Sequence, residues 1–283
     1  MTRVLGAVLC AATVVAAQAT TIDVDALWNY GDPAASEARF REALVGARGD
    51  DALILRTQIA RTLGLRKRFE DAERELEAVQ AQMAQAGPEV GVRLALERGR
   101  WLRSSGRPAD SVAWFERAFE QADAARLERL AADALHMVAL AVPTLDERMA
   151  WNRRTIDYAR KASDPKARGW EAPALNNVGS DLREAGRLDE SLAAFREALA
   201  AYERTGRADG IRFARWQVAN VLRLQGRHDE ALAQQLALER DAAAAGQPDP
   251  YVYDELALLH AAVGQADAAE RARARARELR RGR

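Results

Sequence analysis

Four short glycine turns recur along the chain in the same setting, and they constrain the fold more than any other feature. They centre on Gly106, Gly186, Gly226 and Gly264, which lie 80, 40 and 38 residues apart. Each follows an apolar helical pattern, and an acid with a small residue comes soon after it. Glycine adopts at little cost the positive φ with which a chain leaves one helix for the next. A repeat of this kind near 40 residues predicts a solenoid of helix pairs.

The residue composition supports helices and excludes several other classes. Ala, Leu, Glu, Arg and Gln dominate, and all are good helix formers. Only 6% of the residues are aromatic, which argues against the thick core of a sandwich or barrel. The 42 Lys and Arg residues balance 42 Asp and Glu residues, so no general attraction to nucleic acid is expected. We expect an all-α protein with thin, closely packed interfaces.

The clearest copy of the repeat has a fixed order of apolar and small residues. It reads Leu175, Val178, Gly179 and Leu182, then Gly186, then Ser191, Phe195 and Ala198. This order resembles the tetratricopeptide repeat, W-x2-L-G-x2-Y followed by A-x3-F. Small residues at Gly179 and Ser191 allow two antiparallel helices to approach, while the apolar side chains fill the space around the contact. Glu203 stands where the family usually has proline. The spacing exceeds the usual ~34 residues, as in a long-helix subclass with repeats of about 40.

Further copies of the pattern lie in register at residues 56–76, 95–118, 218–238 and 253–276. Between 126 and 162 a degenerate copy is expected, in which Pro143-Thr144 replaces the glycine turn and the register is unclear. Residues 36–44 predict a second helix whose partner is truncated. The resemblance implies a right-handed superhelical solenoid of antiparallel helix pairs, about six of them. We divide the chain into residues 1–19, an N-terminal capping helix region at 20–47 and a repeat domain at 48–283.

Residues 1–19 have the features of a secretory signal peptide. Arg3 precedes an apolar run from Val4 to Ala17, and small residues at Ala17 and Ala19 suit cleavage. The run is shorter than the roughly 20 apolar residues of a spanning helix, so we expect no stable membrane anchor. Export to the periplasm or the medium is expected. The alternative is a start codon assigned too far upstream, which would leave a cytoplasmic protein. Cleavage would remove Cys10, the only cysteine.

No pattern of catalytic or metal-binding residues is found. The three histidines, His136, His228 and His260, have no second ligand three or four residues away. We assign His228 to a turn and His260 to helix packing, and keep His136 alone as a candidate for a functional role. Gly179-Ser180-Asp181 lacks the G-x-S-x-G elbow. Acids such as Asp189-Glu190 at helix starts complement the helix dipole. We therefore expect no enzyme, no cofactor and no metal site.

The resemblance also implies which positions of the first helices line the concave face. The residues carried over as the partner-binding groove are mostly hydrogen-bond donors: Arg61, Arg93, Arg100, Asn176, Asn177, Arg183, Trp216 and Asn220. Phe213 and Tyr251 occupy related positions. Arg and Asn side chains suit carboxylates and peptide backbone. Solvated arginines and core packing of Trp216 are the alternatives. The family's two-carboxylate clamp is not reproduced, which puts binding of chaperone tails in doubt.

These features predict a non-catalytic scaffold or adaptor that holds a peptide or a segment of another protein, acidic if the arginines bind it. The alternative is a regulatory sensor that binds a small molecule or a peptide. The basic run from Arg271 to Arg277 suits phosphates or anionic lipid. Its alternate arginines, however, wrap around a helix, and cations favour a helix C-terminus. We do not expect nucleic acid as a partner.

Overall fold

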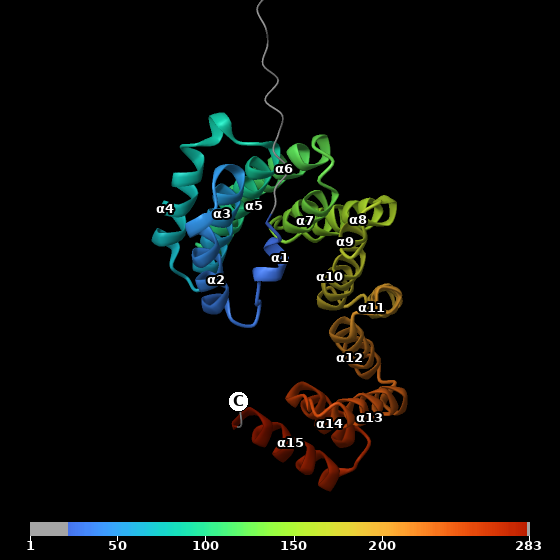
Figure 1. Ribbon diagram of the computed structural model, residues 1–283. Coiled ribbons are helices and arrows are strands. Elements are labelled where there is room, and N and C mark those ends of the chain that lie inside the picture. The colour runs from blue at the N-terminus through green and yellow to red at the C-terminus, as the bar shows by residue number, and fades with distance from the viewer. Residues whose placement is uncertain (1–21, 282–283) are drawn as a thin grey trace, which may run out of the picture.

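The computed structural model describes residues 22–281, so the predicted signal peptide at residues 1–19 lies outside the described residues. The described chain forms one curved stack of antiparallel helices without a strand (Figure 1). The predicted fold class, an all-α solenoid of helix pairs, is confirmed. None of the helices among residues 22–281 is long and apolar enough to span a membrane.

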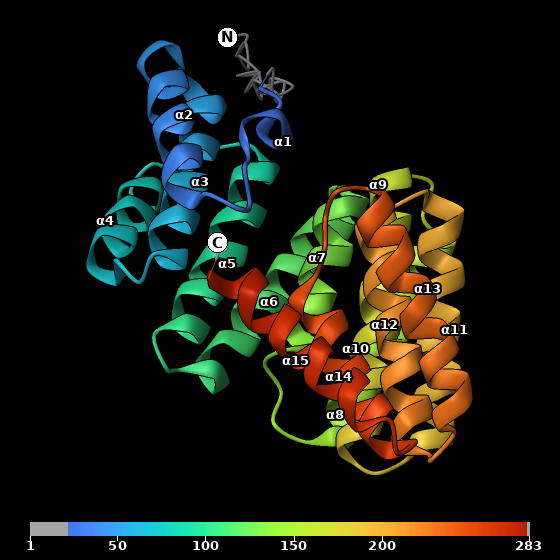
Figure 2. The ribbon, with the colours of Figure 1, turned by 90° about the horizontal axis from the view of Figure 1, so that it is seen from below.

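Six helix pairs form the stack, and each pair packs on the next. The first helices of the pairs lie on the inner side of the curve in Figure 1; they are α3 (Gly49–Leu65), α5 (Pro88–Ser104), α7 (Glu128–Ala139), α10 (Glu171–Glu184), α12 (Ala208–Leu224) and α14 (Pro250–Ala262). The second helices are α4 (Phe69–Gln80), α6 (Pro108–Ala124), α8 (Leu145–Lys161), α11 (Leu188–Thr205), α13 (His228–Ala244) and α15 (Ala266–Arg281). Figure 2 shows α11 at the outer edge, with α10 and α12 on its inner side.

Four further elements, three of them short, lie outside this regular pairing. They are α1 (Val24–Leu27), α2 (Pro33–Gly46), the 3-10 turn η1 (Met83–Gln85) and α9 (Pro165–Arg168). Helix α2 packs on α3 and contains the predicted helix at 36–44. A single-turn helix, α1, stands where the truncated partner was expected. The one-turn α9 is inserted between α8 and α10, after the degenerate copy.

The predicted close crossing within a pair is present in the α10–α11 pair. A Cβ added to Gly179 would lie 2.8 Å from ring atoms of Phe195, whose side chain is fully buried. The Ser191 hydroxyl donates a hydrogen bond of 2.7 Å to the carbonyl oxygen of Gly179. Gly99 and Phe115 repeat this contact between α5 and α6, at 2.5 Å. Small residues therefore set the helix separation in both pairs.

The turns between paired helices follow the glycine prediction at four places. Gly106, Gly186, Gly226 and Gly264 have φ of +92°, +73°, +76° and +77°. Two other turns between paired helices are formed without such a glycine. Lys67 adopts φ of 59° between α3 and α4, and Thr144 caps α8 in a reciprocal capping box with Glu147. The degenerate copy is therefore a complete pair, α7 and α8.

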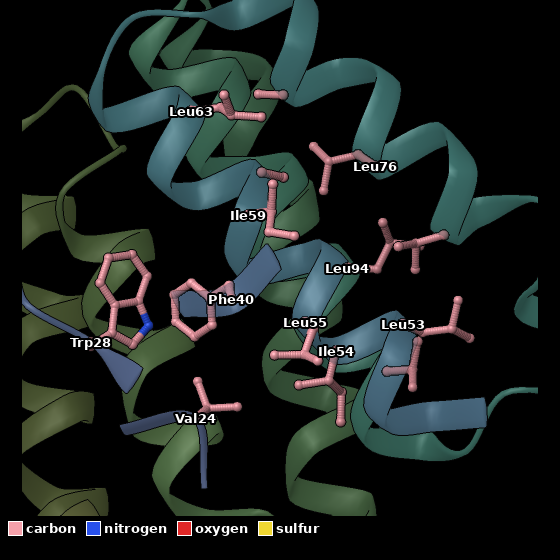
Figure 3. Packing of buried hydrophobic residues seen from close by; sticks show 14 residues of the cluster. Val24, Trp28, Phe40, Leu53, Ile54, Leu55, Ile59, Leu63, Leu76 and Leu94 are labelled. Carbon is pink, nitrogen blue, oxygen red and sulfur yellow. The ribbon is translucent and has the colours of Figure 1, made fainter. Parts of the chain in front are cut away.

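Residues 22–31, here called the strap, leave the stack and lie against the inner side of the curve, with α1 near α7 (Figure 1). Val24 and Trp28 of the strap belong to the N-terminal hydrophobic cluster. In Figure 3, Trp28 lies beside Phe40 of α2, with ring centres 5.2 Å apart and planes at 72°. The indole Nε1 of Trp28 donates a hydrogen bond to Gln58 Oε1 of α3 at 3.0 Å. The strap is thus anchored at one end by α2 and α3.

Candidate functional site

Side-chain ion pairs join neighbouring first helices along the inner side of the N-terminal half. Arg100 of α5 donates two hydrogen bonds to Asp133 of α7, at 2.6 and 2.7 Å, and one to Glu97 at 2.5 Å. Nη1 of Arg61 lies 4.0 Å from the same carboxylate of Glu97. Burial alone would raise the pKa of Asp133, but the charge of Arg100 outweighs it and holds that pKa below its usual value. These contacts fix α3, α5 and α7 relative to one another.

The same arrangement continues in the C-terminal half. Arg183 of α10 donates to Gln217 Oε1 at 2.7 Å and to Asn220 Oδ1 at 3.0 Å, both on α12. Asn220 and Arg223 of α12 both donate to the buried carboxylate of Glu255 on α14, at 3.2 and 2.5 Å. We call the contacts of both halves the inner ladder. Its hydrogen bonds occupy several of the donors that were predicted to face a partner.

The remaining polar residues of the predicted groove are also engaged or buried. Arg93 is buried and donates to Glu89 of its own helix at 2.7 Å. Nδ2 of Asn177 lies 3.4 Å from Nδ1 of His136 on α7, which suits a neutral imidazole. Oδ1 of Asn176 is buried and accepts no hydrogen bond from the described residues. None of these residues is a solvated side chain on an open helix face.

His136 is the histidine that was kept as a candidate, and its surroundings favour the neutral form. Its ring lies 4.9 Å from that of Trp170. Burial, with a smaller contribution from the charges of Arg100 and Arg103, lowers the pKa of His136 to about 4, although the carboxylate of Asp133 acts in the opposite direction. Among residues 22–281, no group of three His, Asp or Glu side chains is arranged to hold a metal ion.

A pocket of about 650 Å³ lies between the strap and the inner helices. We call it the strap pocket. The strap contributes Val24, Asp25, Trp28 and Tyr30 to its walls. The charged residues of the solenoid that line it are Arg61, Arg93, Glu97, Arg100, Arg129, Asp133, Lys166 and Arg207. Three predicted groove residues, Arg61, Arg93 and Arg100, thus come together here.

A second pocket, of about 1040 Å³, lies in the C-terminal half, and we call it the aromatic pocket. Phe213 and Trp216 of α12 line it together with Tyr251 and Val252 of α14 and Leu279 of α15. Phe213 is 47% exposed and Tyr251 60% exposed. Nε1 of Trp216 donates to the carbonyl oxygen of Tyr251 at 3.2 Å, so this indole bridges two first helices and also lines the pocket.

Most of the predicted groove residues are therefore divided among two pockets and the inner ladder, while Asn176 and Asn177 belong to none of them. Asn176, Asn177, Arg183 and Asn220 line neither pocket. Sequence reasoning missed the ladder acids Glu97, Asp133 and Glu255 and the whole strap. The ladder had a signal: partners such as Arg100 and Asp133 are 33 residues apart, which is somewhat less than one repeat and joins a first helix to the next one. The contact of the strap with the far wall had none, because the partners of Asp25 are 104 and 141 residues away.

Part of the sequence matches a known family model. Residues 170–237, from the residue before α10 into α13, match the tetratricopeptide repeat. This segment contains the clearest copy of the repeat found in the sequence. Among curated proteins, none matches the chain.

Solved structures with the same fold cover most of the chain. RapI in its apo form superposes with a TM-score of 0.70 at 10% identity, over 86% of this chain and 70% of RapI. A signal transduction ATPase with numerous domains and a tetratricopeptide repeat sensor, from Pyrococcus horikoshii, superposes with a TM-score of 0.69 at 10% identity. The match covers 87% of this chain and 39% of that protein. A Rap protein complexed with Competence and Sporulation Factor gives 0.58 at 14% identity, over 84% and 67%. At these identities the likeness shows a shared fold.

Proposed function

This chain is a tetratricopeptide-like helical repeat protein, and we propose that it is a non-catalytic scaffold or sensor that binds a peptide or an extended segment of another protein. The binding surface comprises the inner side of the solenoid with the strap pocket, and the aromatic pocket between the last two helix pairs. Residues held by the inner ladder keep this surface in place before a partner arrives, which lowers the ordering cost of binding.

The observation that carries the proposal is the aromatic pocket. Phe213 and Tyr251 expose large side chains beside Trp216, in a concavity whose walls are mainly apolar and also include Asp209, Arg212, Asp249 and Glu278. Isolated exposed apolar residues are normal, but several that converge in one pocket are typical of binding sites. Aromatic side chains of this kind supply much of the binding energy at peptide and protein interfaces. The pocket therefore suits an apolar side chain of a bound peptide.

The structural neighbours support a peptide or protein partner. One Rap protein was solved in complex with Competence and Sporulation Factor. The Pyrococcus horikoshii protein carries a tetratricopeptide repeat sensor. By analogy of fold, we propose a comparable binding or sensing task for this chain.

An array of mixed-sequence peptides, probed with the purified chain, tests the proposal. We expect a subset of peptides with apolar residues to bind, and Phe213→Ser to weaken them by roughly thirtyfold, the loss typical of an interface hot spot of about 2 kcal/mol. Leu224→Ser is the matched control, since Leu224 lies on the same helix, is 44% exposed and does not line the pocket.

The outcome that contradicts the proposal is an array without bound peptides, or bound peptides that respond equally to both substitutions. Circular dichroism of each variant checks that the helices remain. Small-angle X-ray scattering with and without a selected peptide then separates the two forms of the proposal. A scaffold keeps its radius of gyration, whereas a sensor changes curvature and with it the radius.

A further inference from the structure

The strap forms one wall of the strap pocket and is held to the solenoid mainly by its side chains. Its helix α1 is a single turn, capped by hydrogen bonds from the amides of Asp25 and Ala26 to the carboxylate of Asp23. Trp28 stacks on Tyr30, with ring centres 4.8 Å apart and planes at 1°. The guanidinium of Arg61 lies 5.3 Å from the centre of the Trp28 ring. A short segment that is held mainly by its side chains is comparable in size to a peptide ligand in a groove.

Asp25 is the residue that connects the strap to the far wall. Its Oδ1 accepts a hydrogen bond of 2.7 Å from Arg129 of α7, and its Oδ2 accepts one of 2.6 Å from Lys166 of α9. Burial would raise the pKa of Asp25, but hydrogen bonds and charges of Lys166 and Arg129 outweigh it and lower that pKa. The two cations are 37 residues apart in sequence and converge on one carboxylate.

Cationic side chains outnumber carboxylates in the lining of the strap pocket even with Asp25 present, and the excess grows without it. Six cationic side chains and three carboxylates line it, and Asp25 is one of the three. The other two, Glu97 and Asp133, are bound to Arg100 within the inner ladder. A strap that moved away would leave Arg129 and Lys166 without the carboxylate that now binds them. The pocket would then attract another anionic group to the same place.

We infer that the strap is an internal ligand and that the external partner is an acidic peptide, one of whose carboxylates replaces Asp25 between Arg129 and Lys166. This rests on the proposed function, since it specifies the chemistry of the bound peptide and how its access is regulated. A tethered occupant competes at an effective concentration near the millimolar range, so it weakens an external ligand without any change in the pocket. Loosening the strap therefore raises the apparent affinity for an acidic peptide.

The probe is a fluorescent synthetic peptide with the sequence of residues 22–31, titrated into the full chain by fluorescence anisotropy. We expect Asp25→Asn in the protein to tighten binding at least about tenfold over the unsubstituted chain, because the amide no longer pairs with the two cations. Adding Arg129→Gln to Asp25→Asn removes one of the two hydrogen-bond donors and reverses this gain. The probe with asparagine in place of its own Asp25 should bind weakly to every variant.

Asp110→Asn is the matched control in the protein, because Asp110 is an exposed acid outside the pocket that pairs only locally with Arg107. It removes the same charge and should leave probe binding unchanged. Lys166→Gln serves as a second variant in the Asp25→Asn background. The Lys166 side chain is 61% exposed, so this change does not endanger the fold and should also weaken the probe.

The inference is overturned if Asp25→Asn and the unsubstituted chain bind the probe equally, if neither binds it, or if Arg129→Gln and Lys166→Gln have no effect. These results are separable from the test of the proposed function, which depends on Phe213 and the peptide array. If array peptides bind through the aromatic pocket but the probe does not bind, the proposed acidic ligand is rejected and the proposed function stands. If neither the array peptides nor the probe bind, both the proposed function and the proposed acidic ligand are rejected.

Discussion

At single positions, the fold depends on glycines that leave room for a neighbouring ring. We predict that Gly179→Ala destabilises the chain by about 1–3 kcal/mol, because the added methyl group overpacks against the buried ring of Phe195. The measurement is urea unfolding followed by circular dichroism.

Gly64→Ala is the matched control for this substitution. A Cβ at Gly64 meets nothing within 4 Å, and the residue lies in a helix, so alanine should stabilise by about 0.5 kcal/mol. Equal effects at Gly64 and Gly179 would show that helix propensity alone decides both, and that the contact with Phe195 does not set the helix separation.

The sequence predicted the structure well at positions where backbone conformation or side-chain size determines the residue type. The turn glycines and the Gly179–Phe195 contact follow from backbone freedom and side-chain size, so both could be predicted. Lys67 and Arg126 adopt φ of 59° and 56° although they are not glycines. Such turns carry no sequence signal, because the surrounding helices impose the conformation.

Between elements, the inner ladder decides how the first helices are spaced. We predict that Arg100→Gln costs about 3 kcal/mol or more, because it leaves the buried carboxylates of Asp133 and Glu97 without their main partner. The double variant Arg100→Met with Asp133→Leu should recover much of this loss, since no unpaired charge then remains at Asp133. Chemical unfolding of the single and double variants measures both values.

Arg227→Gln is the exposed counterpart. Arg227 pairs with Glu230 at the start of α13, where both side chains are largely solvated, and its loss should leave the stability almost unchanged. A comparable loss at Arg100 and Arg227 would mean that the ladder contributes no more than a surface ion pair.

The helices themselves were predictable from apolar spacing, but the partners of their polar residues were not. Arg61, Arg100 and Asn220 were assigned to a groove by their positions on the first helices. In the structure, Arg100 and Asn220 donate hydrogen bonds to acids of the next pair, and Arg61 lies 4.0 Å from the carboxylate of Glu97. Which acid contacts which arginine depends on how far successive helix pairs are shifted relative to one another. No single repeat encodes this shift. Only the 33-residue spacing between Arg100 and Asp133 hinted at it.

For the whole molecule, the joint between α7 and α10 is a place where acid should weaken the stack. The pKa of His136 is about 4 in the folded chain, against about 6.5 when unfolded, so the unfolded chain binds more protons between these values. Stability that is complete above pH 6.5 is therefore lost as the pH falls towards 4. We predict a loss of up to about 2 kcal/mol between pH 7 and pH 5.

His136→Gln should flatten this part of the stability profile, since glutamine does not titrate there. Thermal or urea unfolding of both chains at several pH values is the measurement. Because each pair of a solenoid contacts mainly its neighbours, a weakened joint lowers the cooperativity of unfolding as well as the midpoint. Parallel profiles for the two chains would assign the pH dependence to other groups.

The strap also has a consequence for the order in which the molecule is completed. Asp25 is near the beginning of the described chain, yet its partner Lys166 comes 141 residues later. Contacts between such distant residues close a long loop and form slowly, whereas each helix pair folds from local contacts. During synthesis the strap leaves the ribosome long before α9 exists. The first described residues of this protein are thus among the last to reach their final place.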